Sequence, residues 1–196
     1  MTENQLKQVL ACADRDAIEN LLGLYCRAID RLDLELLKSV YHPDALDDHG
    51  AIHASGHDFA ETIVELLRKV CVYSMHSIAH AVIEIDGETA TSEATYFGFH
   101  TIDAGAESIE AFFGPQYLEE QRLAGRLNQR HEYVCGGRYL DVLHKRDGVW
   151  RIFRRKMTNE WSLCRPQSSV YEGIAGAVHV PGSRDRIDPV YRLLQS

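Results

Sequence analysis

The dipeptide Asp86-Gly87 lies between two long runs of β-prone residues, and this arrangement constrains the fold more than any other feature of the sequence. Residues 76–85 precede it, and residues 89–102, rich in Thr, Tyr and Phe, follow it. Asp-Gly favours the tight turn of a β-hairpin because these residues tolerate positive φ. The same pattern recurs at Arg146-Asp147-Gly148, between residues 132–144 and 149–163. The sequence therefore predicts two long hairpins.

The N-terminal part of the chain has helical periodicity instead. Asp14 is a candidate N-cap for a helix that ends near Asp30. Its apolar residues have the spacing of an amphipathic helix: Ile18, Leu21, Leu22, Tyr25 and Ile29. Two further helices are predicted, a short one that begins after Asp33 and ends before Pro43, and one over residues 58–73.

Helices followed by long antiparallel strands are typical of an α+β domain with the helices on one face of a curved sheet. A cavity between the two layers would suit a small molecule. The predicted organisation is an N-terminal extension (1–13), one domain (14–164) and an extended tail (165–196) that packs on the body or on a neighbouring subunit. Residues 47–56 are interpreted as an irregular or short-stranded connection, residues 103–114 as a loop and residues 116–130 as a polar segment with a short helix.

The composition of the chain argues against several classes of binding partner. A formal net charge of −8 argues against a surface for nucleic acid or anionic membrane, since both attract Lys and Arg. No apolar run is long enough to span a bilayer, and the N-terminus lacks the pattern of a signal peptide. The five scattered cysteines lack any Cys-x-x-Cys pair, which favours reduced thiols and a cytoplasmic location.

Several segments together resemble the SnoaL-like branch of the nuclear-transport-factor-2-like superfamily, over residues 14–161. They are Tyr25 and Asp30 in the first helix and the runs 41–45, 76–90, 137–141 and 146–152. The resemblance implies a cone-shaped, cystatin-like α+β fold, in which three N-terminal helices pack on a strongly curved, mainly antiparallel sheet that encloses a pocket. Members of the superfamily include scytalone dehydratase, bile-acid 7α-dehydratase, hexachlorocyclohexane dehydrochlorinase, ketosteroid isomerases and polyketide cyclases. Non-catalytic small subunits of ring-hydroxylating dioxygenases share the fold, so the site must be argued from its residues.

Asp30 and His76 are the first candidates for catalysis. The resemblance implies a dyad, because dehydratase and dehydrochlorinase members place an Asp near the end of the first helix and a His at the first long strand. An imidazole titrates near neutral pH and can remove a proton from carbon, and a carboxylate on its other nitrogen fixes the tautomer. The alternative is a charge at a helix end and an unrelated surface histidine.

Tyr25 and Arg138 complete the predicted catalytic set. The resemblance gives Tyr25 the role of a hydrogen-bond donor or acid in the pocket, and a core tyrosine is the alternative. Arg138 shares a strand face with Val134, Leu140 and Val142, which we expect to point inward. A buried arginine needs an anionic partner, so it either pairs with a structural acid or polarises the substrate.

Four further residues are candidates for substrate binding: His100, His80, Tyr96 and Cys26. His100 shares a strand face with Tyr96, and a scytalone dehydratase-like enzyme has a second histidine near this place. His80 falls on the same strand face as His76 if the strand alternates regularly. Cys26 lies one helical turn before Asp30, although a small buried hydrophobic residue is the alternative.

His49, His53 and His57 recur every four residues, but Gly50 and Gly56 interrupt the helix that a metal site with this spacing needs. No metal is therefore expected. No cofactor is expected either, since the sequence lacks a phosphate-binding Gly-rich loop and a dinucleotide fingerprint.

These observations predict a cofactor-independent lyase of the dehydratase type, acting on a small hydrophobic cyclic substrate with a His-Asp dyad as general base. Two alternatives stay open: an isomerase or cyclase that uses the same proton abstraction, and a non-catalytic partner subunit or ligand-binding protein. A homo-oligomer, dimer or trimer, is expected, because open curved sheets usually bury their outer face against copies.

Overall fold

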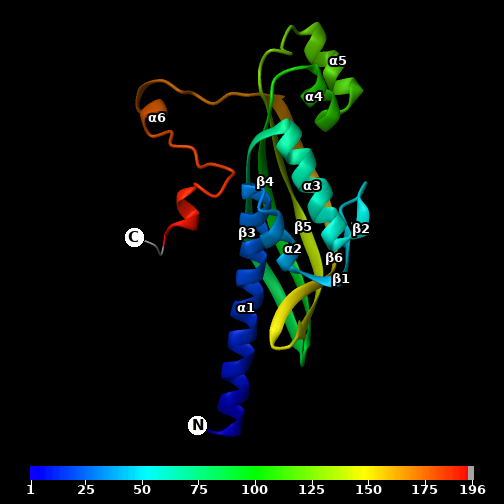
Figure 1. The fold of residues 1–196 in the computed structure, drawn as a ribbon, viewed down its shortest axis with the longest axis vertical. Helices are drawn as coiled ribbons and strands as arrows, with labels where there is room; N and C mark the ends of the chain where they lie inside the picture. Colours follow the sequence, from blue (N-terminus) through cyan, green and yellow to red (C-terminus); the bar gives the residue numbers. More distant parts are fainter. Residues whose placement is uncertain (194–196) are drawn as a thin grey trace.

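The computed structural model describes residues 1–193, and its centre is a curled six-stranded sheet beside one long helix (Figure 1). The elements along the chain are α1 (Glu3–Arg31), α2 (Leu34–Ser39), β1 (Tyr41–Asp48), β2 (His53–Ser55), α3 (Gly56–Val70), β3 (Cys71–Asp86), β4 (Thr89–Ile102), α4 (Ala106–Phe113), α5 (Pro115–Leu123), β5 (His131–Arg146), β6 (Val149–Pro166), α6 (Gly173–Ala177) and η1 (Pro189–Tyr191). The α+β class and the curved, mainly antiparallel sheet are confirmed. The sheet is not closed.

The strand order is β2-β1-β6-β5-β4-β3, and only the β1–β6 pair is parallel. Both predicted hairpins are present, with Asp86 opposite Thr89 in one and Arg146 opposite Val149 in the other. In the second turn Asp147 and Gly148 both have positive φ, 51° and 77°. These turns set the register of the four long strands and hence which residues share a face.

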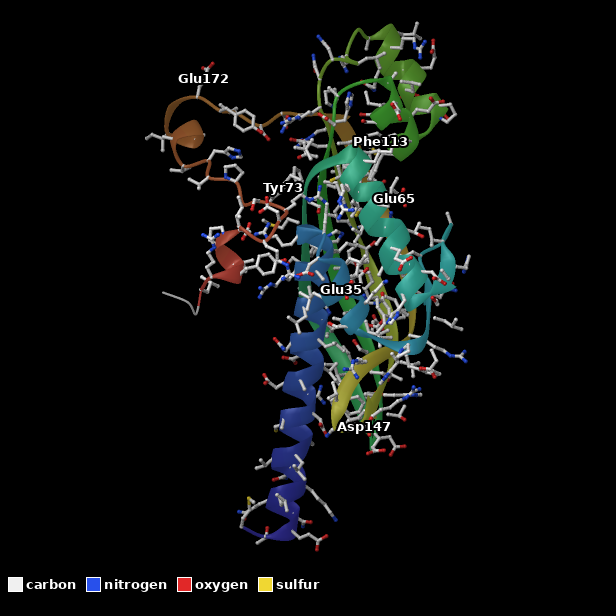
Figure 2. All side chains as sticks on the ribbon, viewed as in Figure 1. Glu35, Glu65, Tyr73, Phe113, Asp147 and Glu172 are labelled. Carbon is white, nitrogen blue, oxygen red and sulfur yellow. The ribbon has the colours of Figure 1, made fainter. Side chains whose placement is uncertain are left out.

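Three N-terminal helices cover the inner face of the sheet, as expected. Side chains fill the space between α3 and the strands, whereas the first turns of α1 extend past the sheet (Figure 2). The shared core includes Ile18 and Leu22 from α1, Phe59 and Leu67 from α3, and Ile152 from β6. The buried aromatic and aliphatic side chains exclude water from the layer that holds the candidate site.

The first helix begins earlier than the sequence indicated. Its N-cap is Thr2, whose side chain forms a capping box with Gln5, so the expected cap at Asp14 is wrong. Asp14 lies inside the helix, and its Oδ1 accepts hydrogen bonds from Lys145 Nζ at 2.6 Å and Trp150 Nε1 at 2.8 Å. An acidic residue that precedes an apolar stripe can therefore be a tertiary contact rather than a cap.

Residues 103–114 contain a helix, α4, where a loop was expected. Gly105 and Gly114 bracket this helix with φ of 106° and 87°, so they mark its two ends. Eight residues are too few for a clear helical period, which explains the error. Residues 47–56 contain the end of β1 and the short strand β2.

The tail after β6 loops away and returns beside α1 (Figure 1). It contacts the end of α1 through Asp188, whose Oδ2 lies 3.4 Å from Arg31 Nε, and through Tyr191, whose hydroxyl donates to Asp33 at 2.9 Å. In the described part of the chain, no helix has the length and apolar character of a membrane span.

Candidate active site

A partly open cavity of about 150 Å³ lies between the helices and the inner face of the sheet. A cavity of this size holds a ring the size of benzene. Most of its wall is aromatic and aliphatic. Its side chains with polar atoms include Tyr25, His49, His76, Tyr96, His100, Tyr133, Tyr139 and Asn159.

His76 lines this cavity, and Asp30 contacts the His76 imidazole from the last turn of α1. Oδ1 of Asp30 lies 2.7 Å from Nδ1 of His76, and Oδ2 accepts the backbone N–H of His76 at 2.8 Å. Their side chains are only 13% and 7% exposed. With Nδ1–H donated to the carboxylate, Nε2 is the nitrogen that carries the free lone pair. The close approach expected from the sequence is therefore present.

The local structure explains this approach. Asp30 is in the last turn of α1, which ends where Leu32 adopts a left-handed conformation. His76 lies on β3, opposite Gly98 of β4. A Cβ at Gly98 would lie 3.3 Å from His100 Cε1 and 3.4 Å from His76 Cδ2. The missing side chain thus leaves room for the two imidazole rings.

His100 stands edge-on to His76, with ring centroids 4.9 Å apart. Burial lowers the pKa of His100 well below its ordinary value, and the positive charges of His76 and Arg184 act in the same direction. His100 is therefore neutral at pH 7. In residues 1–193 no group forms a hydrogen bond with its buried Nδ1.

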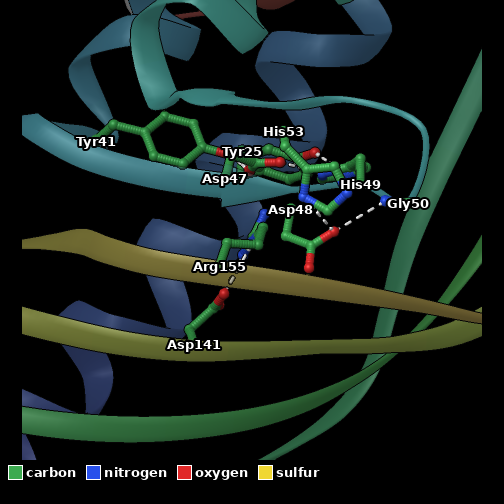
Figure 3. Close-up of polar contacts among 9 residues, drawn as sticks. All are labelled: Tyr25, Tyr41, Asp47, Asp48, His49, Gly50, His53, Asp141 and Arg155. Atoms are coloured by element: carbon green, nitrogen blue, oxygen red, sulfur yellow. Dashed lines mark hydrogen bonds and ion pairs between the residues drawn. The ribbon is translucent and has the colours of Figure 1, made fainter.

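Tyr25 enters the cavity from α1 and is wholly buried. Its hydroxyl lies 3.3 Å from Nε2 of His49, and the Nδ1 of His49 contacts Oδ1 of Asp47 (Figure 3). Burial raises the pKa of the Tyr25 phenol, so Tyr25 stays protonated. It can donate a hydrogen bond to an oxygen in the cavity.

The buried arginine beside the cavity is Arg155, which no pattern in the sequence indicated. Its Nε and Nη2 each donate to a carboxylate oxygen of Asp141 at 2.7 Å, and both side chains have no exposed surface. The guanidinium carbon lies 4.1 Å from the centre of the Tyr25 ring and 4.2 Å from that of Tyr139. The ion pair thus supports the aromatic wall of the cavity.

The inward orientation expected of Arg138 is wrong. Its side chain is 43% exposed on the outer face, where Nε lies 2.9 Å from Glu93 and Nη1 pairs with Glu160. Both faces of β5 carry apolar residues, so alternation alone did not identify the inner one. The inner face is that of Tyr139 and Asp141.

The expected position of His80 on the face of His76 is also wrong. The pairing of β3 with β4 shifts between Ile78 and His80, as at a β-bulge, and His80 is exposed rather than on the face of His76. Tyr96 does line the cavity, stacked on Tyr139 with centroids 4.4 Å apart.

Cys26 lies outside this cavity, in a groove between α1 and β3 that Asp30 and His76 also line. Burial and the nearby Asp30 charge raise the pKa of its thiol to about 12. A thiol with so high a pKa is a poor nucleophile at neutral pH.

The protein is thus an α+β domain with a curled sheet and a carboxylate–imidazole pair beside an aromatic-lined cavity. The chain belongs to the SnoaL-like domain family, whose model matches residues 11–156. A search of curated proteins finds no match.

Solved structures agree with this fold. A scytalone dehydratase-like protein of Novosphingobium aromaticivorans is 17% identical and superimposes with a TM-score of 0.60 over 78% of this chain and 88% of the other. The hexachlorocyclohexane dehydrochlorinase LinA-type3 of Novosphingobium barchaimii is 14% identical and superimposes with a TM-score of 0.61 over 83% of this chain and 96% of the other. A nuclear transport factor 2-like protein of Salmonella enterica is 16% identical, with a TM-score of 0.58 over 76% of this chain and 92% of the other. At these identities the likeness establishes the fold.

Proposed function

We propose that the protein is a cofactor-independent lyase that eliminates water from a small hydrophobic cyclic substrate. The observation that carries this proposal is the largely buried contact of the Asp30 carboxylate with His76, whose ring lines the cavity. A purely structural domain has no need of a paired base beside such a cavity. The family includes dehydratases and dehydrochlorinases, which supports an elimination.

In this proposal the Nε2 of His76 removes a proton from the carbon next to a carbonyl group. The Asp30 carboxylate stabilises the imidazolium that forms. The electron pair of the broken C–H bond forms a C=C bond, and the hydroxyl group on the next carbon departs. The neutral His100 lines the same cavity as His76 and can hydrogen-bond the carbonyl oxygen as it gains negative charge, which leaves Tyr25 for the departing oxygen. Arg138 has no part in the reaction, because it lies on the outer face.

Cyclic β-hydroxy ketones such as 3-hydroxycyclohexanone test this function, because a six-membered ring fits the cavity. We expect the protein to convert such a ketone to the unsaturated ketone with loss of one water, measured by mass spectrometry. A product of unchanged mass would indicate an isomerase instead.

Two variants test the roles of the pair. His76→Gln and Asp30→Asn should each lower the rate of water loss about 100-fold or more, because general base catalysis contributes that much. Exposed His80 on the same strand offers the matched control, and His80→Gln should retain the rate. Full activity of His76→Gln would overturn the proposal.

We also propose that the protein forms a homo-oligomer through the outer face of its sheet. Phe97 and Trp161 are 46% and 44% exposed there, with ring centroids 6.1 Å apart, and Met75 and Leu163 are more than half exposed. Such a patch favours burial against another protein surface. Light scattering should give a multiple of the chain mass, and Phe97→Lys should lower it.

A further inference from the structure

A second imidazole–carboxylate pair reaches the same cavity from another element. His49 directly follows β1. Its Nδ1 contacts Oδ1 of Asp47, which lies two residues earlier in the chain (Figure 3). The Asp47 side chain has no exposed surface, and its Oδ2 accepts a hydrogen bond from Tyr41 at 2.6 Å. Both carboxylate oxygens are therefore engaged, and the carboxylate holds His49 in one orientation.

The His49 ring is fixed by packing as well. It stacks on Phe59 with centroids 4.2 Å apart and an angle of 23° between the rings, and its side chain is 11% exposed. The backbone N–H of His49 donates to the carbonyl of Ile52 at 2.9 Å. This leaves Nε2 directed at the Tyr25 hydroxyl, 3.3 Å away, and both residues line the cavity.

We propose that Asp47, His49 and Tyr25 form the acid half of the reaction, with Tyr25 protonating the departing oxygen and His49 restoring the proton to Tyr25. The inference rests on the proposed function and adds a second set of residues to it. An elimination of water needs both halves, because hydroxide is a poor leaving group unless it gains a proton as the C–O bond breaks.

The proton and electron balance closes. Nε2 of His76 takes the carbon-bound proton, and the C–H electron pair becomes the C=C bond. The C–O bond breaks with its electron pair on oxygen, which takes the Tyr25 proton and leaves as water. His49 begins this step with a proton on each ring nitrogen, and its Nε2 proton passes to the Tyr25 oxygen. His76 gains one proton and His49 loses one, so the net charge of the protein is unchanged, and exchange with water restores both rings.

Tyr25 alone is a poor acid here. Burial raises the pKa of its phenol, so a tyrosinate left in the cavity would be costly. A proton donor beside the phenol removes that cost, and His49 lies there with its Nδ1 against the Asp47 carboxylate. The other buried cation beside Tyr25, Arg155, is neutralised by Asp141, so it supplies no proton.

Leaving-group dependence tests the proposal. The probes are 3-hydroxycyclohexanone, which loses hydroxide, and 3-chlorocyclohexanone, which loses chloride and needs no acid. After subtraction of the buffer rate, His49→Gln and Tyr25→Phe should each lower water loss about 100-fold while lowering chloride loss less than about 5-fold. Tyr25→Phe keeps the aromatic ring in the core, so it guards against a variant that fails to fold.

The controls separate this inference from the proposed function. His76→Gln should lower both eliminations, because both need the base. His53→Gln should change neither, since His53 lies four residues from His49 but is 67% exposed and pairs with Asp48. An equal fall of both eliminations in His49→Gln and Tyr25→Phe would show a role in cavity shape only and overturn the inference. Unchanged water loss in both variants would overturn it too, while a wild-type protein that converts neither ketone would overturn the proposed function and the inference with it.

Discussion

Asp30 binds His76 through both of its carboxylate oxygens, one to the ring Nδ1 at 2.7 Å and one to the backbone N–H at 2.8 Å. The two bonds tie the last turn of α1 to β3. The ring bond orients the imidazole, and the backbone bond fixes the carboxylate relative to the strand. The pair is therefore preorganised by the fold, which is the requirement for general base catalysis in a dry cavity.

The space left by Gly98 beside the pair leads to a first prediction. Gly98→Ala adds a Cβ that would lie 3.0 Å from Cys135 Sγ and 3.3 Å from His100 Cε1, so Cys135 and the His100 ring must shift. We expect the rate of water loss to fall at least about 10-fold, because small displacements of a group that orients the substrate are costly. The thermal midpoint, measured by calorimetry, should fall by only a few degrees. An unchanged rate would show that the rings do not need this space.

The buried Asp141–Arg155 pair should show a strong asymmetry between single and double variants. Asp141→Asn leaves the Arg155 charge buried without its anion, so the free energy of unfolding should fall by about 3 to 5 kcal/mol. The double variant Asp141→Leu/Arg155→Met removes both charges and should recover most of this loss. Urea denaturation measures both, and a double variant less stable than Asp141→Asn would contradict the account.

Arg184 of the tail connects the ends of two helices. Its guanidinium donates to the carbonyls of Asp30 at 3.3 Å and Leu67 at 3.4 Å, and also to that of Cys71. These carbonyls lie at the C-terminal ends of α1 and α3, where a cation is favourable. Arg184→Gln should therefore lower the free energy of unfolding by about 1 kcal/mol and lower turnover through the Asp30 position.

Arg186 offers the matched control for this variant. It lies on the same tail and pairs with Asp33 at 3.0 Å, but its side chain is 70% exposed. Arg186→Gln should change stability by less than about 1 kcal/mol and leave turnover unchanged. Equal effects of the two substitutions would contradict a specific role for Arg184.

The neutral state of His100 makes stability depend on pH in a defined direction. Burial lowers the pKa of His100 well below 6.5, so between that value and 6.5 the unfolded chain binds a proton that the folded protein does not. The free energy of unfolding should therefore fall as pH decreases below about 6.5, with a contribution from His100 of up to about 1.4 kcal/mol per pH unit. Urea denaturation of wild type and His100→Gln at pH 7.5 and 5.5 should show a smaller fall in the variant. The same fall in both would remove His100 as the cause.

The parts of the fold that the sequence predicted are those with strong local signals. Asp86-Gly87 and Asp147-Gly148 identified the two hairpins, because Gly87, Asp147 and Gly148 have positive φ, which these residue types tolerate. Asp30 and His76 were found because a resemblance to a known family supplied the pairing, and the structure has the two side chains in contact.

The positions of several site residues depended on register shifts in the strands, which the alternation of polar and apolar residues does not reveal. The register shift between Ile78 and His80 in β3 places His80 on the outer face. A second shift, where β6 pairs with Val142 and Leu143 of β5, brings both Ile152 and Arg155 to the inner face of β6. A regular strand would have placed Arg154 inside instead. His49 was missed because its spacing to His53 suggested a metal set, whereas its relation to Asp47, two residues earlier, was the useful signal.

The exchange of carbon-bound hydrogen with solvent tests the central claim most directly, because it needs the base and no leaving group. Cyclohexanone in D₂O, followed by NMR, should exchange its α-hydrogens faster with the wild-type protein than in buffer. His76→Gln and Asp30→Asn should lose about 100-fold or more of this acceleration, and His80→Gln should keep it. Exchange at the buffer rate with the wild-type protein, or undiminished exchange with His76→Gln, would contradict the account.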